Sequence, residues 1–214
     1  MNIRNVIRLK ICGMRDVANM LDVAALGPDY MGFIFYELSP RFVGKQFSIP
    51  SDFPESIKRV GVFVNEDSDV VLDLIQKHRL DFVQLHGDEA VSYSEKLKAH
   101  NVGIFKVFRV DEKFDFTRTE QFENLSDYFL FDTKGNHYGG NAVKFNWNLL
   151  QQYKGSVPFF LSGGISAKDA ELTEFYHDKW YGVDVNSGVE IKPGLKDKTK
   201  VKNMVQLLNL PINK

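Results

Sequence analysis

The sequence predicts an α/β fold in which residues 1–214 form a single (β/α)₈ barrel domain, the TIM-barrel architecture. Eight short runs rich in Val, Ile, Phe and Tyr recur along the chain, and stretches with helical periodicity separate several of them. No low-complexity linker divides the chain, and 214 residues are an ordinary length for one α/β barrel. The alternation of strands and helices favours parallel βαβ units.

The eight apolar runs are expected to be the barrel strands. Several are continuously apolar, which is typical of parallel strands that are buried on both faces. In chain order they are Leu9–Cys12, Tyr30–Phe35, Val60–Val64, Phe82–His86, Ile104–Phe108, Tyr128–Asp132, Phe159–Ser162 and Tyr181–Val185. A doubly wound open sheet is the alternative, but it usually has fewer strands in this length and often a glycine-rich first turn.

Several intervening stretches have the periodicity of helices. Asp16–Leu26 is expected to be a helix that stops at Gly27, with an apolar face formed by Val17, Met20, Leu21, Ala24 and Ala25. Asp67–His78 is expected to be another, with a face formed by Val70, Val71, Leu74 and Ile75. Ser166 is a plausible N-cap of a further helix, Asp197–Leu208 predicts the final helix, and Pro40–Pro54 reads mostly as loop.

Composition and charge exclude several classes of protein. With 27 basic and 28 acidic residues the net charge is −1, so nothing indicates a surface for nucleic acid. A lone cysteine cannot form an internal disulfide, which fits a reducing compartment. No signal-peptide pattern and no run of about 18 apolar residues is present, so we expect a soluble cytoplasmic chain that does not bind membranes.

Polar residues gather at the ends of the predicted strands, where barrels of this class have their active sites. Cys12, the only cysteine, ends the first run and precedes Gly13. An inert buried thiol is the common alternative for an isolated cysteine. At a strand end, however, the thiol would face the site, close to the start of the next helix, where a thiolate is stabilised. We therefore predict a catalytic Cys12.

Asp132 follows four apolar residues at the end of the sixth run. It could be a structural aspartate that caps loop backbone. Apolar surroundings, however, favour the neutral, proton-donating form of a carboxyl group, which suits a general acid. Strands one and six lie on roughly opposite sides of an eight-stranded ring. A small substrate between Cys12 and Asp132 would meet a proton acceptor and a proton donor, as in an isomerase that needs no cofactor.

Other strand-end residues suggest how a substrate is bound. Arg41, in the loop after the second strand, could pair with a substrate carboxylate, although most surface arginines are merely solvated. Gly163-Gly164 and Ser187-Gly188 follow the last two strands, where such barrels often bind phosphate through backbone N–H groups; each could also be a simple turn. His86 reads more readily as a hydrogen-bonded structural histidine than as a proton-transfer group. No metal-ligand spacing and no nucleotide-binding motif occurs, so no metal or cofactor is implied.

Several motifs together resemble those of one known family. K-I-C-G-M, G-F-I-F-Y with S-P-R-F, Q-L-H-G-D, F-D-T-K, Y-G-G-N, F-N-W, L-S-G-G-I and G-V-D-V-N-S-G-V-E occur in order from Lys10 to about Asp197. The chain in this respect resembles the phosphoribosylanthranilate isomerases. The resemblance implies a (β/α)₈ barrel of tryptophan biosynthesis that catalyses an Amadori rearrangement. In it, N-(5-phosphoribosyl)anthranilate becomes 1-(2-carboxyphenylamino)-1-deoxyribulose 5-phosphate by general acid and base catalysis.

The resemblance also implies roles for individual residues. The general base falls on Cys12, the general acid on Asp132 and the arginine for the anthranilate carboxylate on Arg41. The phosphate-binding loops fall on Gly163, Gly164, Ser187 and Gly188, and His86 and Asp184 occupy substrate-binding positions near the site. One departure is Ala142, which replaces a glycine that family members often carry after Y-G-G, so the loop after strand six is expected to differ in stiffness or shape.

Two other functions remain as alternatives. One is another phosphate-binding barrel, an isomerase or lyase that acts on a different phosphosugar and should lack the pairing of Cys12 with Asp132. The other is a sensor or scaffold that binds a phosphorylated metabolite without turnover. In each case the partner is a small phosphorylated molecule, and the chain itself could be a monomer or a homodimer.

Overall fold

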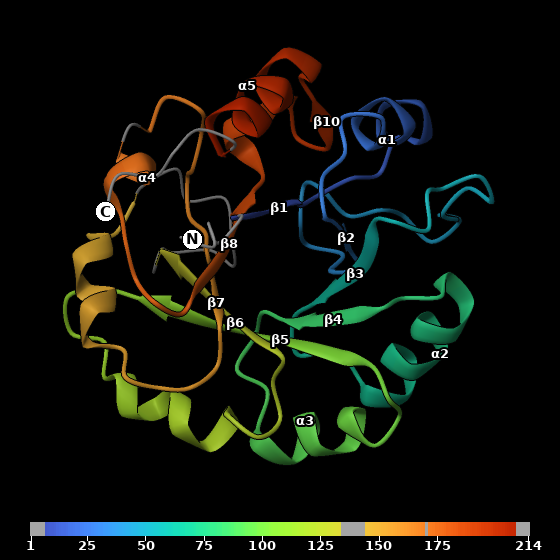
Figure 1. The fold of residues 1–214 in the computed structure, drawn as a ribbon. Coiled ribbons are helices and arrows are strands. Elements are labelled where there is room, and N and C mark those ends of the chain that lie inside the picture. Colours follow the sequence, from blue (N-terminus) through green and yellow to red (C-terminus); the bar gives the residue numbers. More distant parts are fainter. Residues whose placement is uncertain (1–6, 134–143, 170, 209–214) are drawn as a thin grey trace.

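The computed structural model describes residues 7–133, 144–169 and 171–208, and its eight parallel strands close into a barrel in the order β1 to β8 (Figure 1). This confirms the predicted fold class. Every predicted strand is present, with small shifts at its ends. The strands are β1 Arg8–Ile11, β2 Tyr30–Ile34, β3 Lys58–Phe63, β4 Phe82–Leu85, β5 Gly103–Val110, β6 Tyr128–Thr133, β7 Phe159–Leu161 and β8 Trp180–Val185.

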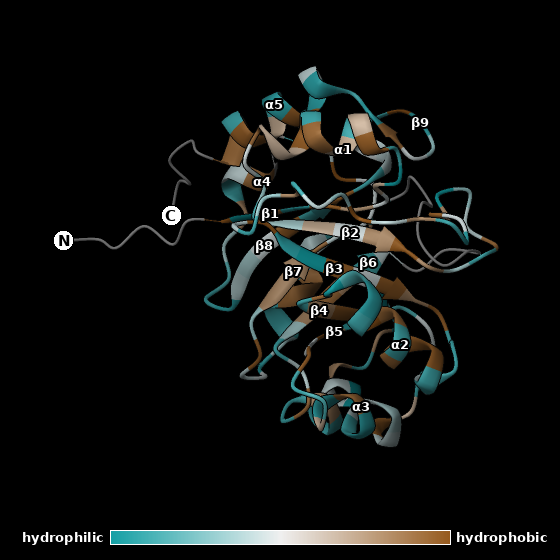
Figure 2. Ribbon diagram, turned by 90° about the vertical axis from the view of Figure 1, so that its right-hand side faces the viewer, coloured by the Kyte–Doolittle hydropathy of each residue, from teal (hydrophilic) through white to brown (hydrophobic). Residues whose placement is uncertain are grey.

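The connections between the strands cover the outside of the barrel, and Figure 2 shows helices on both sides of the strands. The helices are α1 Val17–Ala24, α2 Ser68–His78, α3 Val91–Lys98, α4 Glu171–Glu174 and α5 Lys198–Leu208. Short 3₁₀ helices occur as η1 Phe116–Phe122, η2 Trp147–Gln152 and η3 Ser187–Val189, and β9 Glu190–Lys192 pairs with β10 Leu195–Lys196. As predicted, loop and turn structure fills most of the connection between β2 and β3. Within the described residues no helix is long and apolar enough to cross a membrane.

Aspartates begin the first two helices. The side chain of Asp16 accepts a hydrogen bond from Asn19 N at 2.8 Å, and that of Asp67 accepts one from Asp69 N at the same distance. Each cap satisfies a backbone donor that has no partner within its helix. Gly27, with φ +72°, donates to the carbonyl of Ala24, so α1 ends at Ala24, two residues before the predicted last residue Leu26.

The predicted apolar faces of α1 and α2 are partly wrong. Val17 and Val70 remain 45% and 44% exposed, whereas Asn19 is buried. Asn19 lies against β10: its Nδ2 donates to the carbonyl of Lys196 at 2.9 Å, and its Oδ1 accepts from Lys196 N at 2.8 Å. A polar residue therefore occupies the buried face of α1, because the neighbouring segment offers unpaired backbone groups there.

The expectation that Ser166 caps a helix is also wrong. The described helix α4 begins at Glu171, and Ser166 instead starts a turn, in which its N–H donates to Asp169 Oδ2 at 2.6 Å. Ser166 Oγ also accepts from Lys168 N at 3.3 Å, so the serine caps this turn and not the described helix. The prediction about Ala142 concerns residues 134–143, which lie outside the described part of the chain.

Aromatic and aliphatic side chains fill the amino-terminal half of the barrel, called its lower half below. Phe105 and Phe160 meet there with their ring centroids 5.1 Å apart, and the cluster also contains Tyr30, Val60, Val107 and Leu130. Above this cluster the inward positions of the strands become polar, with Lys10, Gln84 and Asp184 buried among them. The barrel is therefore packed at its amino-terminal end, and among the described residues the space for a ligand inside the ring lies at its carboxyl-terminal end.

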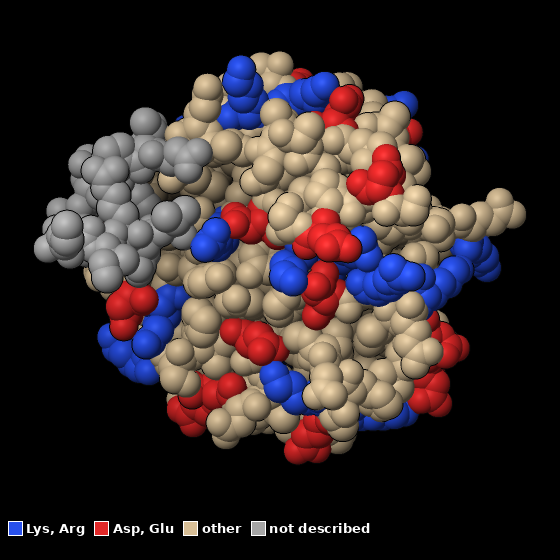
Figure 3. Space-filling model, turned by 45° about the vertical axis from the view of Figure 1, so that its right-hand side comes forward, with Lys and Arg blue, Asp and Glu red and all other residues tan. Residues whose placement is uncertain are grey.

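Charges of both signs alternate on the face of the molecule that Figure 3 shows. The pattern agrees with the balanced composition of 27 basic and 28 acidic residues. An anionic ligand would therefore depend on donors within the site itself and not on a large positive field.

Candidate active site

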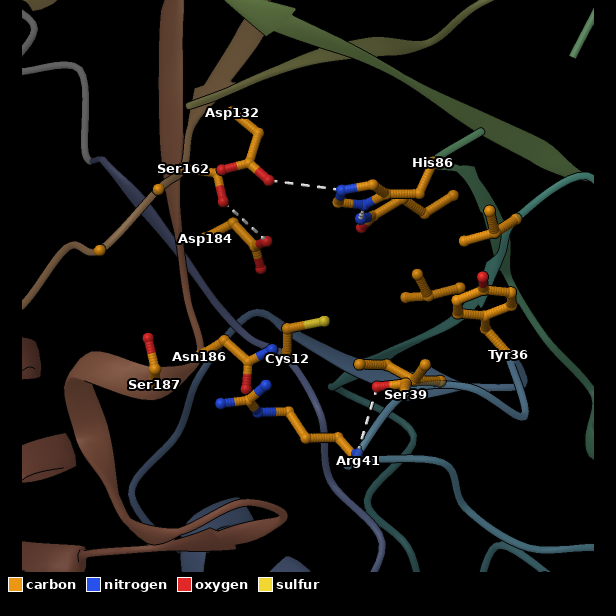
Figure 4. Close-up of a pocket in the computed structure, with 16 residues that line it drawn as sticks. Cys12, Tyr36, Ser39, Arg41, His86, Asp132, Ser162, Asp184, Asn186 and Ser187 are labelled. Carbon is orange, nitrogen blue, oxygen red and sulfur yellow. Dashed lines mark hydrogen bonds and ion pairs between the residues drawn. The ribbon is translucent and has the colours of Figure 1, made fainter. Parts of the chain in front are cut away.

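A pocket opens at the carboxyl-terminal end of the barrel, and its lining comes from residues at or just beyond the strand ends (Figure 4). It contains eight of the nine site residues that the sequence predicts, namely Cys12, Arg41, His86, Asp132, Gly163, Gly164, Asp184 and Ser187. It also contains Ile34, Tyr36, Ser39, Val62, Val64, Gln84, Ser162 and Asn186. The ninth predicted residue, Gly188, is not part of the lining.

Cys12 follows β1, and in Figure 4 its sulfur points into the pocket. Its residue is 3% exposed, and Ile34 and Val62 pack against it. Burial raises the pKa of the thiol; the ammonium groups of Lys10 and Lys196 lower it, and the carboxylate of Asp184 raises it. The net shift is upward, so the lowered pKa expected from a helix terminus is not what the structure gives. Lysine side chains supply the charges that favour the thiolate.

Asp132 is the last inward-facing residue of β6. His86, the residue just after β4, lies beside it. Asp132 Oδ1 accepts from Thr133 N at 2.8 Å, and Asp132 Oδ2 lies 3.3 Å from His86 Nε2. The His86 contact lacks the alignment of a full hydrogen bond. On the other side of the imidazole, Gln84 Nε2 lies 2.8 Å from His86 Nδ1. A donor amide there favours the tautomer that carries its proton on Nε2, facing Asp132.

Asp184, on β8, projects into the middle of the site in Figure 4. One of its oxygens accepts from Lys10 Nζ at 2.7 Å, and the other from Ser162 Oγ at 3.3 Å. Lys10 is wholly buried, so this is an ion pair removed from solvent. Lys10 on β1 and Ser162 just after β7 fix the Asp184 carboxylate in one orientation in the lining of the pocket.

Arg41 reaches the pocket from the loop after β2. Its Nε and Nη2 donate to Glu190 at 2.9 and 2.7 Å, a two-point pairing that leaves Nη1 outside the pair. Glu190 Oε1 also accepts from Lys196 Nζ at 2.8 Å. Burial alone would raise the pKa of Glu190, but its bonds with Arg41 and Lys196 outweigh burial and lower that pKa. The guanidinium is therefore held by a carboxylate of this chain.

Glycines shape the loops after β7 and β8. Gly163 and Gly164 have φ values of +94° and +67°, and neither N–H donates to another described residue. Successive N–H groups in such a turn can form a concave anion site. A Cβ on Gly188 would lie 2.0 Å from the carbonyl oxygen of Ile165, so Gly188 instead allows the loops after β7 and β8 to touch.

Sequence reasoning missed several residues around these groups. Lys10 and Gln84 each lie two positions before a predicted site residue, so the alternation of side chains along a strand indicates that they point the same way. That signal was available in K-I-C and in Q-L-H. No comparable local signal links Glu190 with Arg41. Among the described residues no group of three or more His, Cys, Asp or Glu could hold a metal ion.

Comparison with known proteins gives a consistent result. The family model for N-(5'-phosphoribosyl)anthranilate (PRA) isomerase matches residues 9–207. The chain is 43% identical to N-(5'-phosphoribosyl)anthranilate isomerase of Parabacteroides distasonis, over 95% of this chain and 94% of that protein. It is 42% identical to the enzyme of the same name from Phocaeicola vulgatus, over 95% of this chain and 98% of that protein.

Solved structures agree with these relatives. A phosphoribosyl anthranilate isomerase in complex with reduced 1-(o-carboxyphenylamino)-1-deoxyribulose 5-phosphate superposes with a TM-score of 0.80 at 30% identity, covering 94% of this chain and 98% of that one. The isomerase of Thermus thermophilus superposes with a TM-score of 0.77 at 25% identity, with the same coverage. With the barrel and its thiol- and carboxyl-lined pocket, these matches show that the chain belongs to the N-(5'-phosphoribosyl)anthranilate isomerase family.

Proposed function

We propose that the pocket at the carboxyl-terminal end of the barrel is the active site, with Cys12 as general base and Asp132 as general acid. The chain is an intramolecular aldose–ketose isomerase that acts on N-(5'-phosphoribosyl)anthranilate in tryptophan biosynthesis. The observation that carries the assignment of roles is that Cys12 and Asp132 line one pocket from different strands. Their placement allows a substrate to meet both groups at once.

Asp132 acts first in the proposed reaction. Its carboxyl group gives a proton to the furanose ring oxygen, the bond from that oxygen to C1 breaks, and the nitrogen lone pair forms a Schiff base with C1. Thr133 N and His86 Nε2 lie against the two Asp132 oxygens, at 2.8 and 3.3 Å. These contacts limit rotation of the carboxyl group, which supports transfer of its proton in one direction.

Cys12 acts second. Its thiolate removes the proton from C2, and the electron pair moves through C1 to the nitrogen to give an enolamine. The enolamine takes up a proton at C1 and loses the proton of its C2 hydroxyl, which gives the ketose. No atom is gained or lost overall, so the reaction as written needs only proton transfer.

Binding is assigned to the remaining residues of the pocket. Arg41 Nη1, which Glu190 does not engage, is the donor that we assign to the anthranilate carboxylate. The N–H groups of Gly163 and Gly164 are assigned to the phosphate, together with the loop that carries Ser187 and Gly188. His86 and Asp184 are assigned to the sugar between these two anionic ends.

Replacement of the two catalytic residues tests the proposal. We expect Cys12→Ala and Asp132→Asn each to lower kcat by roughly 10²–10⁴-fold, because each removes one proton-transfer group. Consumption of the fluorescent substrate measures the rate, and circular dichroism checks that the fold is intact. Asp69→Asn on the exposed side of α2 serves as a control that should keep full activity. Near-normal turnover by either variant would reject the role assigned to that residue.

The same assay separates this function from the alternatives. A binding protein would retain the substrate analogue without turning the substrate over, and a barrel specific for another phosphosugar would do neither. We expect the wild-type chain to turn over phosphoribosylanthranilate without added metal or nucleotide.

We also propose that the chain works in the cytoplasm, as a monomer or homodimer. The lone thiol suits a reducing compartment, and a relative from Thermotoga maritima is described as dimeric. Sedimentation equilibrium distinguishes the two assemblies, and an assembly of higher order would contradict both.

A further inference from the structure

Lys10 lies two residues before Cys12, and both side chains point into the barrel. A Cβ built on Gly32 of the neighbouring strand β2 would lie 2.7 Å from Cys12 Sγ and 3.2 Å from Lys10 Nζ. The sulfur and the ammonium group therefore both lie over the same glycine, where the lack of a side chain gives them room. Lys10 itself is 0% exposed and lies below the pocket instead of lining it.

Asp184 holds the ammonium in this place. Its Oδ1 lies 2.7 Å from Lys10 Nζ, and β1 and β8 pair in a register that sets Lys10 directly opposite Asp184. Burial opposes the charged form of Lys10, but attraction to Asp184 and Cys12 outweighs it and raises the pKa of the ammonium. Lys10 thus remains a cation inside the barrel. A buried ion pair contributes little stability by itself, so its position beside the thiol calls for another explanation.

Charged groups reach Cys12 from several elements. Lys10 lies on β1, the strand that Cys12 follows, Asp184 lies on β8 and Lys196 on β10. His86, just after β4, and Asp132, on β6, also face the pocket. Lys196 is bound to Glu190 at 2.8 Å and to Asn186 Oδ1 at 2.7 Å, so its charge is shared with that network. Of the charges that favour the Cys12 thiolate, that of Lys10 has the largest effect, and its ammonium lies over Gly32 together with the sulfur.

We propose that Lys10, fixed by Asp184, is a positioning residue for the isomerase reaction: its buried ammonium stabilises the Cys12 thiolate so that Cys12 can act as base. The inference rests on the proposed role of Cys12. It assigns to the buried Lys10–Asp184 pair a function in setting the proton affinity of the thiol. Lys10 lies beneath the pocket, whereas Asp184 also lines it.

The lone cysteine makes the experiment unambiguous, because iodoacetamide alkylation followed against pH reports a single thiol. Lys10→Met keeps the length of the side chain and removes its charge. We expect this change to raise the apparent pKa of the thiol by at least about one unit, which is tenfold in thiolate fraction. The acid limb of the pH profile of kcat/KM should move upward with it, and Lys10→Arg should restore part of the shift.

Lys106→Met is the matched control. Lys106 is another buried lysine, paired with Glu89 Oε2 at 2.7 Å near the ends of β4 and β5, and Cys12 is not among its partners. If the lysines were merely structural, both variants would lose stability and neither would move the thiol. We expect only Lys10→Met to shift the alkylation profile.

A double variant separates the lysine from its partner, because Lys10→Met alone leaves Asp184 unpaired. Lys10→Met with Asp184→Asn removes both charges and therefore leaves no unpaired ion in the barrel. The double variant can be measured even if Lys10→Met alone does not fold. We expect its thiol pKa to exceed that of Asp184→Asn alone, because the two proteins differ only in the charge of Lys10. A thiol pKa equal to or below that of Asp184→Asn would overturn the inference about Lys10 and leave the base role of Cys12 intact. A raised thiol pKa with an unmoved kcat/KM profile would instead reject the base role.

Discussion

Arg41 acts within a network of buried charges. Glu190 occupies two of its nitrogens, and Lys196 and Gly194 N donate to the same carboxylate at 2.8 and 3.0 Å. The carboxylate therefore orients the guanidinium in the pocket and determines which nitrogen remains for a ligand. A planar guanidinium depends strongly on such orientation, because its donors lie in fixed directions.

We expect Glu190→Gln to weaken substrate binding more than chemistry. The neutral amide keeps most of the volume but loses the charge-assisted pairing with Arg41, so KM should rise by about tenfold with a smaller change in kcat. Steady-state kinetics with the wild type as reference measures both constants. A fall in kcat at unchanged KM would show that Glu190 does not act through substrate binding.

Gly32 provides a second prediction at the residue scale. The Cβ of Gly32→Ala would lie 2.7 Å from Cys12 Sγ, so the thiol must move, and kcat should fall strongly with a stability loss of about 1–3 kcal/mol. Gly61→Ala is the control, because its Cβ would meet Leu80 at 2.5 Å and not the site. Turnover and urea unfolding of both variants measure the effects. An equal loss of kcat in both would argue against a local displacement of the thiol.

The last turn of α2 carries a histidine packed between aromatic rings. His78 lies 5.2 Å from Phe35 and 5.7 Å from Phe47, measured between ring centroids. Burial lowers its pKa, and the neighbouring charge of Lys77 adds to this. The imidazole is therefore buried as the neutral base.

The lowered pKa of His78 predicts a pH dependence of stability. Below about pH 6.5 the unfolded chain binds a proton more readily than the folded chain, so the free energy of unfolding falls as the pH is lowered through this range. We expect His78→Phe to show a shallower loss between about pH 6.5 and 5. Urea unfolding at several pH values measures the pH dependence of the free energy of unfolding. Part of the dependence that remains in the variant should come from His177, because burial lowers the pKa of this histidine too. Identical slopes in the two proteins would contradict the prediction.

At the scale of elements, the sequence predicts the strands better than the connections. Every apolar run became a strand because parallel strands inside a barrel are buried on both faces. Helix faces were harder to predict: Asn19 is buried and Val17 exposed, since β10 lies against α1. The turn at Ser166 depends on Asp169, and nothing in the periodicity of that stretch distinguishes such a turn from a helix start.

At the scale of the whole molecule, stability and chemistry occupy opposite ends of the barrel. Phe105 and Phe160 fill the lower half, whereas the polar groups lie above them. We expect Phe105→Ala to lower the free energy of unfolding by about 3–5 kcal/mol, because it leaves a cavity in the barrel interior. Urea unfolding measures this loss. Activity at low temperature should stay close to that of the wild type, and a specific loss of kcat in a folded variant would contradict the separation.

The sequence by itself determined the barrel, the strand ends and the polar residue types at those ends, because side-chain alternation and apolar runs are local patterns. It also marked Cys12 and Asp132, each at the end of its own run. Only the tertiary structure decided their partners. Lys10 meets Asp184 across 174 positions, because closure of the barrel pairs β1 with β8 in one register, and Arg41 meets Glu190 across 149 positions. No local pattern records that register, so the charges around the thiol and the guanidinium emerge only when the ring closes.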